Sequence, residues 1–392
     1  MRNRIFAKAS ALSLALAASW PTWTWAQPAL PPDKPLVPHR RDSRGSVCTL
    51  AGPGHHAGAV TFSPDGSTLF VGYVDGSIRR FDAKSGRQLG PTVENHMASI
   101  EALAVSPDGQ GLAVAAPARN SSPLCDLVTI RRPVETEISE ISRIPGRVIA
   151  LAYAADGKTI GAIDDRYNIR VWRVEDRTEV SSSEDPHRAD GRRPAGAVTR
   201  ASFSADLKRA VIVNDADVHF KEGRWNHLVR LWEAGGKEQR IFGDRGGFES
   251  QPITCALASP DGSQFVVAHE LHYVFYHDFA SVRFLHGHSP GFARRGDDLT
   301  FLMLSPDNRR LVSAEKAGSV IVHDLNDKLH GRHGFAGPYG YVRAAAFVPN
   351  GVRFASGGWA PLGNEKIPGT DLLKYEPVLL WEVEVEVEVE GM

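Results

Sequence analysis

The stretch Phe62-Ser63-Pro64-Asp65-Gly66 is a Pro-Asp-Gly turn that lies between two short apolar runs, residues 59–62 and 68–71. Proline presets φ at the first corner of such a turn, and Asp and Gly tolerate the corner that other residues avoid. Six related turns follow in the chain: Ser106-Pro107-Asp108-Gly109, Ala154-Ala155-Asp156-Gly157, Ser204-Ala205-Asp206-Leu207, Ser259-Pro260-Asp261-Gly262, Ser305-Pro306-Asp307-Asn308 and Val348-Pro349-Asn350-Gly351. The steps between their Asp or Asn residues are 43, 48, 50, 55, 46 and 43 residues, a period typical of a propeller or solenoid array.

Each repeat follows the same order of apolar runs and turn residues. In the first repeat, strands are predicted at residues 57–62, 68–73, 77–82 and 87–91. Four short strands separated by turn residues form one antiparallel sheet. One small sheet cannot bury both of its faces, whereas seven sheets packed around an axis can. The sequence therefore predicts an all-β fold, a seven-bladed β-propeller of four-stranded antiparallel sheets.

The repeats resemble the WD40-repeat family over residues 45–384. The likeness lies in the turns, in the Gly-His pairs Gly54-His55 and Gly287-His288, and in the third strands, which end in an aromatic residue and an acid. The Trp of the third strand is kept at Trp172, Trp232 and Trp381, and is replaced by Phe81 and His323. The resemblance implies that residues 45–51 complete the seventh sheet as its outer strand, which closes the ring. It also implies that the hydrogen-bond network of such blades is absent or partial in most blades here.

Residues 1–26 have the pattern of an export signal peptide. Arg2, Arg4 and Lys8 form a basic start, residues 9–20 are apolar, and residues 24–26 (Thr-Trp-Ala) make a cleavage site. A membrane anchor would need about 20 apolar residues, and this run is shorter and is broken by Pro21. No other segment is apolar over a length that could span a bilayer. We therefore predict a periplasmic or secreted bacterial protein.

The predicted domains follow from composition. Residues 27–44 are a Pro-rich linker, residues 45–384 form the propeller, and residues 385–392 are a low-complexity Val/Glu tail. The Val/Glu alternation gives a strand-like segment one apolar and one acidic face. It is either an extension of the last strand, with Glu as a guard against edge pairing, or a strand that binds a partner.

The charge and cysteine content exclude several function classes. Lys and Arg number 45 and Asp and Glu 46, so the net charge of −1 provides no field that would attract nucleic acid or an anionic membrane. The 3 Cys residues form no Cys-x-x-Cys, which argues against redox dithiol, zinc-ribbon and c-type haem sites. The 15 His residues include no His-Glu-x-x-His. We predict no cofactor and no metal site.

The register of the first strands indicates where a binding site would lie. Five residues before the end of each first strand, six repeats have an apolar residue that we expect in the core: Ile100, Val148, Val198, Ile253, Leu299 and Val342. Polar residues stand beside these positions, and the WD40 resemblance implies that they line the mouth of a central channel on the partner-binding face. The candidates are Glu101, Arg147, Arg200, Asp298, Tyr341 and Arg343. Alternatively, these charges pair with one another on a solvated rim.

Long connections are predicted at the same face. The corner between second and third strands is enlarged at residues 117–126, 214–227 and 357–377, and the connections between repeats are long at residues 181–196, 243–251 and 286–297. Loops on a rigid scaffold commonly carry function. Trp225 and Trp359 lie in two of these insertions, and exposed Trp is frequent in binding hot spots. Each Trp could instead hold its own loop against the sheet.

These features favour a non-enzymatic protein-interaction scaffold of the bacterial envelope, which binds a protein or peptide partner on the loop-rich face. The sequence contains no Gly-x-Ser-x-Gly, no phosphate-binding Gly-Lys-Ser/Thr and no Asp box. The Asp residues of the repeated turns occur once per blade, so they cannot form an acid/base pair. We expect a monomer. The alternative is a periplasmic propeller enzyme, a hydrolase or lactonase or a metal-dependent enzyme, with its site at the channel mouth.

Overall fold

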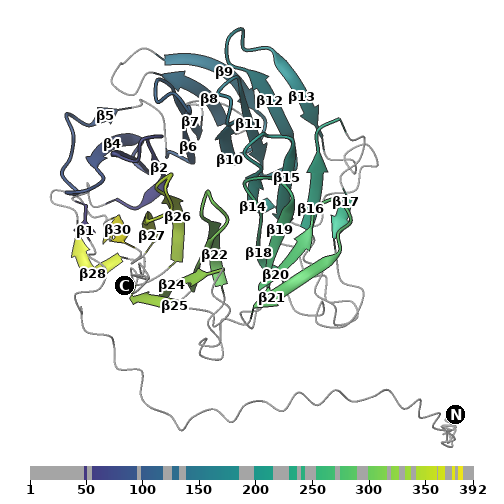
Figure 1. The fold of residues 1–392 in the computed structure, drawn as a ribbon. Helices are drawn as coiled ribbons and strands as arrows, with labels where there is room; N and C mark the ends of the chain where they lie inside the picture. The colour runs from purple at the N-terminus through teal and green to yellow at the C-terminus, as the bar shows by residue number, and fades with distance from the viewer. Residues whose placement is uncertain are drawn as a thin grey trace, which may run out of the picture. The chain divides into compact units, whose positions relative to one another are not determined.

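The computed structural model describes residues 48–50, 55–94, 99–117, 126–131, 138–184, 198–214, 229–235, 240–242, 253–269, 274–288, 299–315, 319–325, 332–336, 341–359, 361–366, 373–375 and 378–382. They belong to one compact unit, Asp42–Met392. The described residues form strands joined by turns and bends (Figure 1). Among them, no helix is long and apolar enough to cross a membrane. The predicted export signal, the linker and the Val/Glu tail lie outside the described residues.

The first four sheets each contain four consecutive antiparallel strands. Sheet 1 contains β2 (Ala57–Phe62), β3 (Thr68–Tyr73), β4 (Ser77–Asp82) and β5 (Val93–Glu94). Sheet 2 contains β6 (Ala102–Val105), β7 (Leu112–Pro117), β8 (Asp126–Arg131) and β9 (Ile138–Ile144). Sheet 3 contains β10 (Val148–Tyr153), β11 (Thr159–Asp164), β12 (Ile169–Arg173) and β13 (Glu179–Ser183). Sheet 4 contains β14 (Val198–Phe203), β15 (Arg209–Asn214), β16 (Val229–Glu233) and β17 (Arg240–Phe242).

The last three sheets have the same size, but the seventh is assembled from both ends of the described chain. Sheet 5 contains β18 (Ile253–Ala258), β19 (Gln264–His269), β20 (Val274–Asp278) and β21 (Phe284–His288). Sheet 6 contains β22 (Leu299–Leu304), β23 (Arg310–Glu315), β24 (Ser319–Asp324) and β25 (Arg332–Ala336). Sheet 7 contains β26 (Tyr341–Phe347), β27 (Arg353–Trp359), β30 (Leu379–Glu382) and β1 (Cys48–Thr49). A separate hairpin, β28 (Pro361–Lys366) with β29 (Leu373–Tyr375), is inserted between β27 and β30.

The N-terminal strand β1 is the fourth strand of sheet 7. Cys48 pairs with Leu380 and Thr49 pairs with Leu379 in antiparallel register. The amide of Leu50 then donates a hydrogen bond of 3.0 Å to the carbonyl of Val378. Leu50 is fully buried in the core between sheets 7 and 1. Residues that are far apart in the sequence are therefore joined by backbone hydrogen bonds in one sheet.

Among the described residues, seven apolar cores lie between successive sheets, and each core takes side chains from two of them. Phe70 and Ile78 of sheet 1 pack with Leu103 of sheet 2 in one core. The core between sheets 6 and 7 includes Val322 and Phe354. Another core joins sheet 7 to sheet 1 and includes Ala344, Leu380, Phe62 and Tyr73. Each sheet buries both faces against its neighbours, which a single sheet could not do. The predicted all-β fold with seven antiparallel sheets is confirmed.

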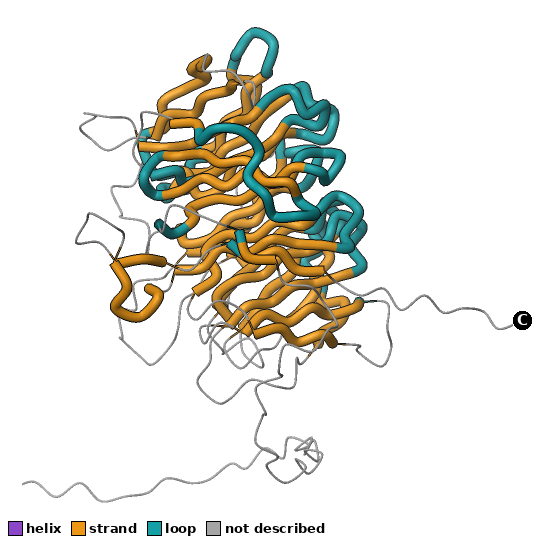
Figure 2. Tube along the Cα trace, turned by 90° about the vertical axis from the view of Figure 1, so that its left-hand side faces the viewer, coloured by secondary structure: helices purple, strands orange, loops and turns teal. Residues whose placement is uncertain are grey.

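The seven repeated turns have one geometry, and most described turns gather along one side of the sheets (Figure 2). In each turn the amide at the fourth position donates to the carbonyl at the first, as Gly66 does to Ser63 at 2.8 Å. The fourth residue has a left-handed φ between 56° and 72° in all seven turns. Glycine adopts this conformation without steric cost, which explains its frequency there. Leu207 is the bulky exception, and its side chain is buried in the core between sheets 3 and 4.

The Ser and Asp side chains of these turns satisfy the backbone that the turn leaves unpaired. Asp65 Oδ1 accepts from the amide of Ser67 at 3.0 Å, and Ser63 Oγ accepts from the amide of Thr68 at 2.9 Å. Hydrogen bonds from the Ser63 hydroxyl and then from Ser67 lower the pKa of Asp65 to about 2. The pKa of Asp108 is lowered in the same way, chiefly by Ser106. Each carboxylate therefore stabilises the folded turn only while it is ionised.

This arrangement predicts an acid-dependent loss of stability. Because folding lowers the pKa of Asp65 from an unfolded value of about 3.9 to about 2, its contribution is present above the unfolded pKa and is lost as the pH falls from about 4 to about 2. Urea unfolding of Asp65→Asn should therefore show a smaller loss of stability across that window than the parent chain shows. Asn is compatible with the turn, since Asn350 Oδ1 accepts from the amide of Val352 at 3.2 Å. Equal losses in the two proteins would contradict this role of Asp65.

One predicted strand is wrong. The fourth strand of the first repeat was expected at residues 87–91, but β5 is Val93–Glu94, and only an isolated bridge between Phe81 and Gln88 remains near the expected position. Gly90 has a φ of 69°, which interrupts an extended strand. Pro91 has no amide hydrogen to donate to a sheet. These two residues delay the strand until Val93.

Candidate functional site

A β-bulge recurs near the start of the first strand in six of the seven sheets. The register with the second strand shifts at Ala57/Ala59, Val148/Ala150, Val198/Arg200, Ile253/Cys255, Leu299/Phe301 and Val342/Ala344. The apolar residues predicted at this level are all buried, as expected: Ile100, Val148, Val198, Ile253, Leu299 and Val342. A bulge leaves one residue without a partner opposite it and redirects its side chain. The residues thereby released from the regular sheet pattern follow the first residue of each shift: Gly58, Ile149, Thr199, Thr254, Thr300 and Arg343.

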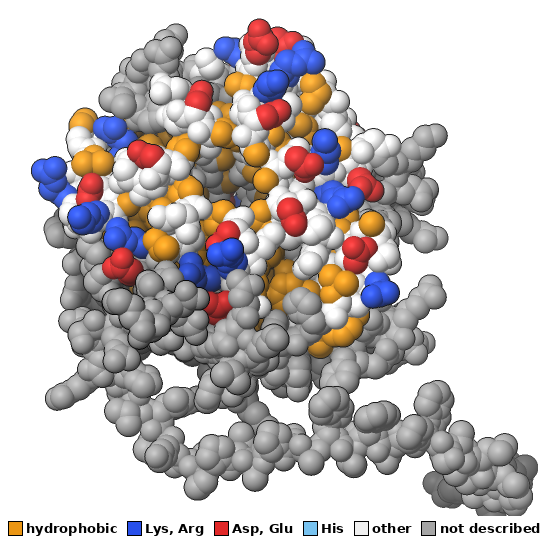
Figure 3. Space-filling view, in the orientation of Figure 1, with side chains coloured by type: hydrophobic (Ala, Val, Ile, Leu, Met, Phe, Trp, Pro, Cys, Tyr) orange, Lys and Arg blue, Asp and Glu red, His pale blue; other side chains and the backbone are white. Residues whose placement is uncertain are grey.

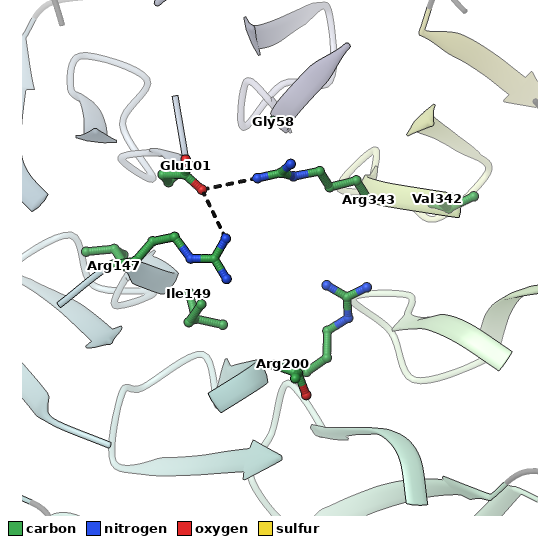
Figure 4. A pocket seen from close by; sticks show the side chains of 9 residues that line it. Gly58, Glu101, Arg147, Ile149, Arg200, Val342 and Arg343 are labelled. Atoms are coloured by element: carbon green, nitrogen blue, oxygen red, sulfur yellow. Dashed lines mark hydrogen bonds and ion pairs between the residues drawn. The ribbon is translucent and has the colours of Figure 1, made fainter. Parts of the chain in front are cut away.

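The starts of five first strands enclose a cavity of about 400 Å³, which we call the arginine pocket (Figure 4). It is lined by Gly58, Glu101, Arg147, Val148, Ile149, Thr199, Arg200, Val342 and Arg343. These residues come from sheets 1, 2, 3, 4 and 7 or directly precede their first strands. The structure thus brings together four residues that the sequence predicted for this site, namely Glu101, Arg147, Arg200 and Arg343.

Glu101 is the centre of an ion-pair cluster in the arginine pocket. Its Oε2 accepts a hydrogen bond from Arg343 Nη2 at 3.2 Å and lies 3.9 Å from Arg147 Nη1. The Glu101 side chain is 11% exposed, whereas those of Arg343 and Arg147 are 31% and 49% exposed. The carboxylate is therefore largely withdrawn from solvent between two guanidinium groups. The three residues belong to sheets 7, 2 and 3, so the cluster connects separate blades.

Gly58 of sheet 1 lines the arginine pocket beside the Arg343–Glu101 pair (Figure 4). A Cβ atom at this position would lie 2.0 Å from the backbone oxygen of Ile100. Glycine is therefore required by the close approach of β2 to the chain that leads into β6.

Arg147 is positioned through its backbone. Its amide donates to Asp165 Oδ1 at 3.0 Å, and its carbonyl accepts from the amide of Asp165 at 2.8 Å. The preceding residue is Gly146, where a Cβ would lie 2.3 Å from Asp165 Oδ1 and 3.0 Å from Asp164 Oδ2. The absence of a side chain lets the carboxylate pair approach the strand start. The corner between β11 and β12 thus sets where Arg147 enters the pocket.

Two titratable groups near the pocket are shifted toward their neutral forms. Burial is the main cause that lowers the pKa of His56 to about 4, and Arg343 and His55 add to the effect. His56 is therefore neutral at pH 7. Burial raises the pKa of the Cys255 thiol, and the neighbouring Arg200 opposes this rise. Cys255 is consequently protonated and contributes no charge beside Arg200.

The other four predicted site residues are not brought into the arginine pocket by the described part of the structure. Asp298 and Trp225 lie outside the described residues. Tyr341 and Trp359 are opposite each other in the β26–β27 register, at the first residue of β26 and the last of β27. The prediction that Trp359 lies in a loop insertion is wrong, because β27 extends to this residue. The backbone pairing with Tyr341 prolongs the hairpin beyond the expected corner.

The sequence prediction missed Gly58 and Ile149 as lining residues of the pocket. Both occupy the bulge position, one residue after the buried apolar residue, as Thr199 does in sheet 4. The same register marks Gly58 and Ile149, but only polar side chains were considered as candidates. The bulge itself has no sequence signature in these strands, since Gly, Ile and Thr all occupy it.

In the part of the chain that the structure describes, no group of three or more His, Cys, Asp or Glu side chains is arranged to hold a metal ion. The arginine pocket has one carboxylate and three guanidinium groups among its described lining residues. Guanidinium groups donate hydrogen bonds to carboxylates and phosphates and do not ligate metals. The arginine pocket therefore contains charged groups of both signs, which suits recognition of a polar partner.

Comparison with protein families gives a match at the start of the described unit. Residues 45–82 match the family model "WD domain, G-beta repeat". The matched segment contains β1 to β4, that is, the strand that joins sheet 7 and three strands of sheet 1. WD40 repeats generally mediate protein–protein interaction and are generally non-enzymatic. The match, together with the seven antiparallel sheets, supports a WD40-type family and a propeller-type protein-interaction scaffold for this chain.

Proposed function

We propose that this protein is a non-enzymatic interaction platform of the bacterial envelope, which binds a protein or peptide partner at the face that contains the arginine pocket. The observation that carries the proposal is the convergence of Glu101, Arg147, Arg200 and Arg343 from separate sheets on one cavity. Side chains that are contributed by several rigid blades keep a fixed arrangement, which lowers the entropy cost of binding.

Charge distribution supports this choice of face. Figure 3 shows the opposite face, where the short turns lie, and there Lys and Arg alternate with Asp and Glu over the described surface. Acidic and basic groups on that face are close partners, as in the pairs Arg209–Glu233 at 3.0 Å and Arg353–Glu382 at 3.1 Å. The arginine pocket instead concentrates guanidinium groups in a cavity. Arg is enriched at the centres of protein interfaces because it combines charge with several directed donors.

The envelope location is part of the proposal and rests on the N-terminal pattern of residues 1–26, with a basic start, an apolar stretch and a cleavage site. A chain exported in this way would meet its partner outside the cytoplasm. The partner should therefore be captured from the envelope fraction of a bacterial cell and be absent from the cytosolic fraction.

The test is capture of partners by the purified chain from both fractions, with Arg343→Ala as the variant. We expect Arg343→Ala to reduce capture about tenfold, since charged hydrogen bonds contribute about 1.5–3 kcal/mol. Arg353→Ala is a matched control, because Arg353 is also 31% exposed and pairs with Glu382 at 3.1 Å, at the turn end of the same hairpin. Unchanged capture by Arg343→Ala would show that the pocket is not part of the binding face.

A further inference from the structure

A second cavity lies beside the arginine pocket, and we call it the apolar cavity. Its volume is about 360 Å³, and it runs along the first strands β14, β18 and β22 of sheets 4, 5 and 6. It is lined by residues 200–203, 205, 255–258, 260 and 301–304. Most of these side chains are apolar, and the large ones Phe203, Phe301 and Met303 are only half-buried. Among the described lining residues, Arg200 alone carries a charge.

Polar side chains at the wall of the apolar cavity are engaged with the protein itself. The amide of Ala258 donates a hydrogen bond of 2.7 Å to Ser202 Oγ, which joins sheet 5 to sheet 4. Arg200 donates a hydrogen bond to the Cys255 thiol, whose pKa is raised chiefly by burial, so the thiol is neutral. In Figure 4 the guanidinium of Arg200 points into the arginine pocket. A molecule in the apolar cavity would therefore contact mainly hydrocarbon surface.

At the end near the repeated turns, a backbone hydrogen bond spans the wall of the apolar cavity between sheets 4 and 5. The amide of Ala205 donates to the carbonyl of Pro260 at 2.8 Å, and both residues line the cavity. A similar bond of 2.7 Å runs from the amide of Ala155 in sheet 3 to the carbonyl of Ala205. Pro occupies this position in the other five turns and has no amide hydrogen to donate. Alanine at residues 155 and 205 therefore supplies bonds between sheets that the Pro-containing turns cannot form.

The volume and the lining of the apolar cavity indicate the size and the polarity of its ligand. Cavities that bind small molecules have volumes of about 300–1,000 Å³ and mainly apolar walls with a few polar groups. Water beside such walls finds few hydrogen-bond partners, so its displacement by an apolar molecule is favourable. A single side chain inserted by a partner protein would leave part of the volume to water. These properties favour a small molecule over a peptide side chain.

We propose that the apolar cavity binds a small, uncharged, mainly hydrocarbon molecule, which packs against Phe203, Phe301 and Met303. This inference goes beyond the proposed function, because it adds a second ligand of a different chemical class. The arginine pocket and the apolar cavity share only Arg200 among their described lining residues. Binding at the two sites can therefore be measured separately.

The experiment titrates the purified chain with two fluorescent probes that share one aromatic skeleton. N-phenylnaphthylamine is uncharged, whereas anilinonaphthalene sulfonate adds a negative charge to the same skeleton. We expect saturable binding of the neutral probe, with an affinity about tenfold or more above that of the anionic probe, because a charge is unfavourable in apolar surroundings. Tighter binding of the anionic probe would contradict an uncharged ligand, and binding of the neutral probe without saturation would contradict a defined site.

Leu304→Gln tests whether the neutral probe occupies the apolar cavity. Leu304 lines this cavity and is half-buried, and Gln is of similar size but brings a polar amide into the wall. We expect the affinity for the neutral probe to fall about tenfold. Leu151→Gln is the matched control, since Leu151 is also half-buried in a first strand and is not a described lining residue of either cavity. Equal affinities in Leu304→Gln and the parent chain would overturn the assignment.

Ala205→Pro tests the wall of the apolar cavity without a change in its side-chain polarity. The variant introduces the residue that five of the turns already contain, and it removes the amide hydrogen that bonds to Pro260. We expect several-fold weaker binding of the neutral probe, because sheets 4 and 5 lose one hydrogen bond at the cavity. Ala155→Pro removes the bond between sheets 3 and 4 and should have a smaller effect. Equal effects of the two variants would contradict a site between sheets 4 and 5.

Arg343→Ala separates this inference from the proposed function. Arg343 lines the arginine pocket and is not among the described lining residues of the apolar cavity, so the variant should bind the neutral probe as the parent chain does. Loss of probe binding in Arg343→Ala would place the probe in the arginine pocket and overturn the inference. Capture of the partner protein by the same variant decides independently whether the proposed function stands.

Discussion

Replacement of Trp381 by Ala is expected to lower the free energy of unfolding by about 3–5 kcal/mol, which is the usual cost of truncating a buried aromatic side chain. Trp381 is 1% exposed in the core between sheets 6 and 7. Its ring stacks on Phe354 at a centroid distance of 5.8 Å and an angle of 11°. Its Nε1 donates a hydrogen bond of 2.8 Å to Ser356 Oγ, which is also buried. Removal of the indole leaves a cavity and an unsatisfied hydroxyl at the same place.

Urea unfolding followed by far-ultraviolet circular dichroism would measure this loss. Trp381→Phe is the control, because Phe81 occupies the corresponding position in sheet 1 and is fully buried there. We expect it to keep most of the packing and to lose about 1–3 kcal/mol through the unsatisfied Ser356 hydroxyl. The double variant with Ser356→Ala should recover part of that loss. A loss below about 1 kcal/mol in Trp381→Ala would contradict the packing described for this core.

Gly58→Val is expected to have an effect on both stability and the arginine pocket. Its Cβ would stand 2.0 Å from the backbone oxygen of Ile100, a separation at which atoms overlap. Strand β2 would have to move away from β6, at a cost of about 1–3 kcal/mol or more for overpacking. The added methyl groups would also change the wall of the arginine pocket, which Gly58 lines. We therefore expect reduced stability together with reduced capture of the partner.

Thr199→Val is the matched control for Gly58→Val. Thr199 occupies the same bulge position in sheet 4, where a β-branched side chain is already present. It is exposed at this position, and its hydroxyl makes a long hydrogen bond of 3.4 Å to the carbonyl of Val213. Thermal unfolding of the two variants should show a marked loss for Gly58→Val and little change for Thr199→Val. Equal behaviour would mean that the backbone at Gly58 moves without cost.

The candidate site could be predicted only in part from the sequence. Glu101, Arg147, Arg200 and Arg343 were found because each stands beside a buried apolar residue at a constant distance from a turn. This constant distance from the turn places the four residues at the same height along the first strands of their sheets. It does not show which of them meet, and Arg343 and Glu101 form a hydrogen bond although they are 242 residues apart. Asp298 and Trp225 stay predictions because they lie outside the described residues.

Local chemistry in the sequence was sufficient to predict the all-β fold and the number of sheets. Each Pro-Asp-Gly turn reverses the chain through interactions within a few residues, as the Ser63 and Asp65 hydrogen bonds show, so its meaning does not depend on distant parts of the protein. The arginine pocket is different. Its ion pairs form because sheets 7, 2 and 3 pack next to one another, and Gly58 of sheet 1 lies against the Ile100 carbonyl beside them. The need for glycine at residue 58 is seen only in the folded structure. The conformation of each turn is determined by residues within that turn. The site forms only where separate sheets approach one another closely, because its contacts are made between residues far apart in the sequence.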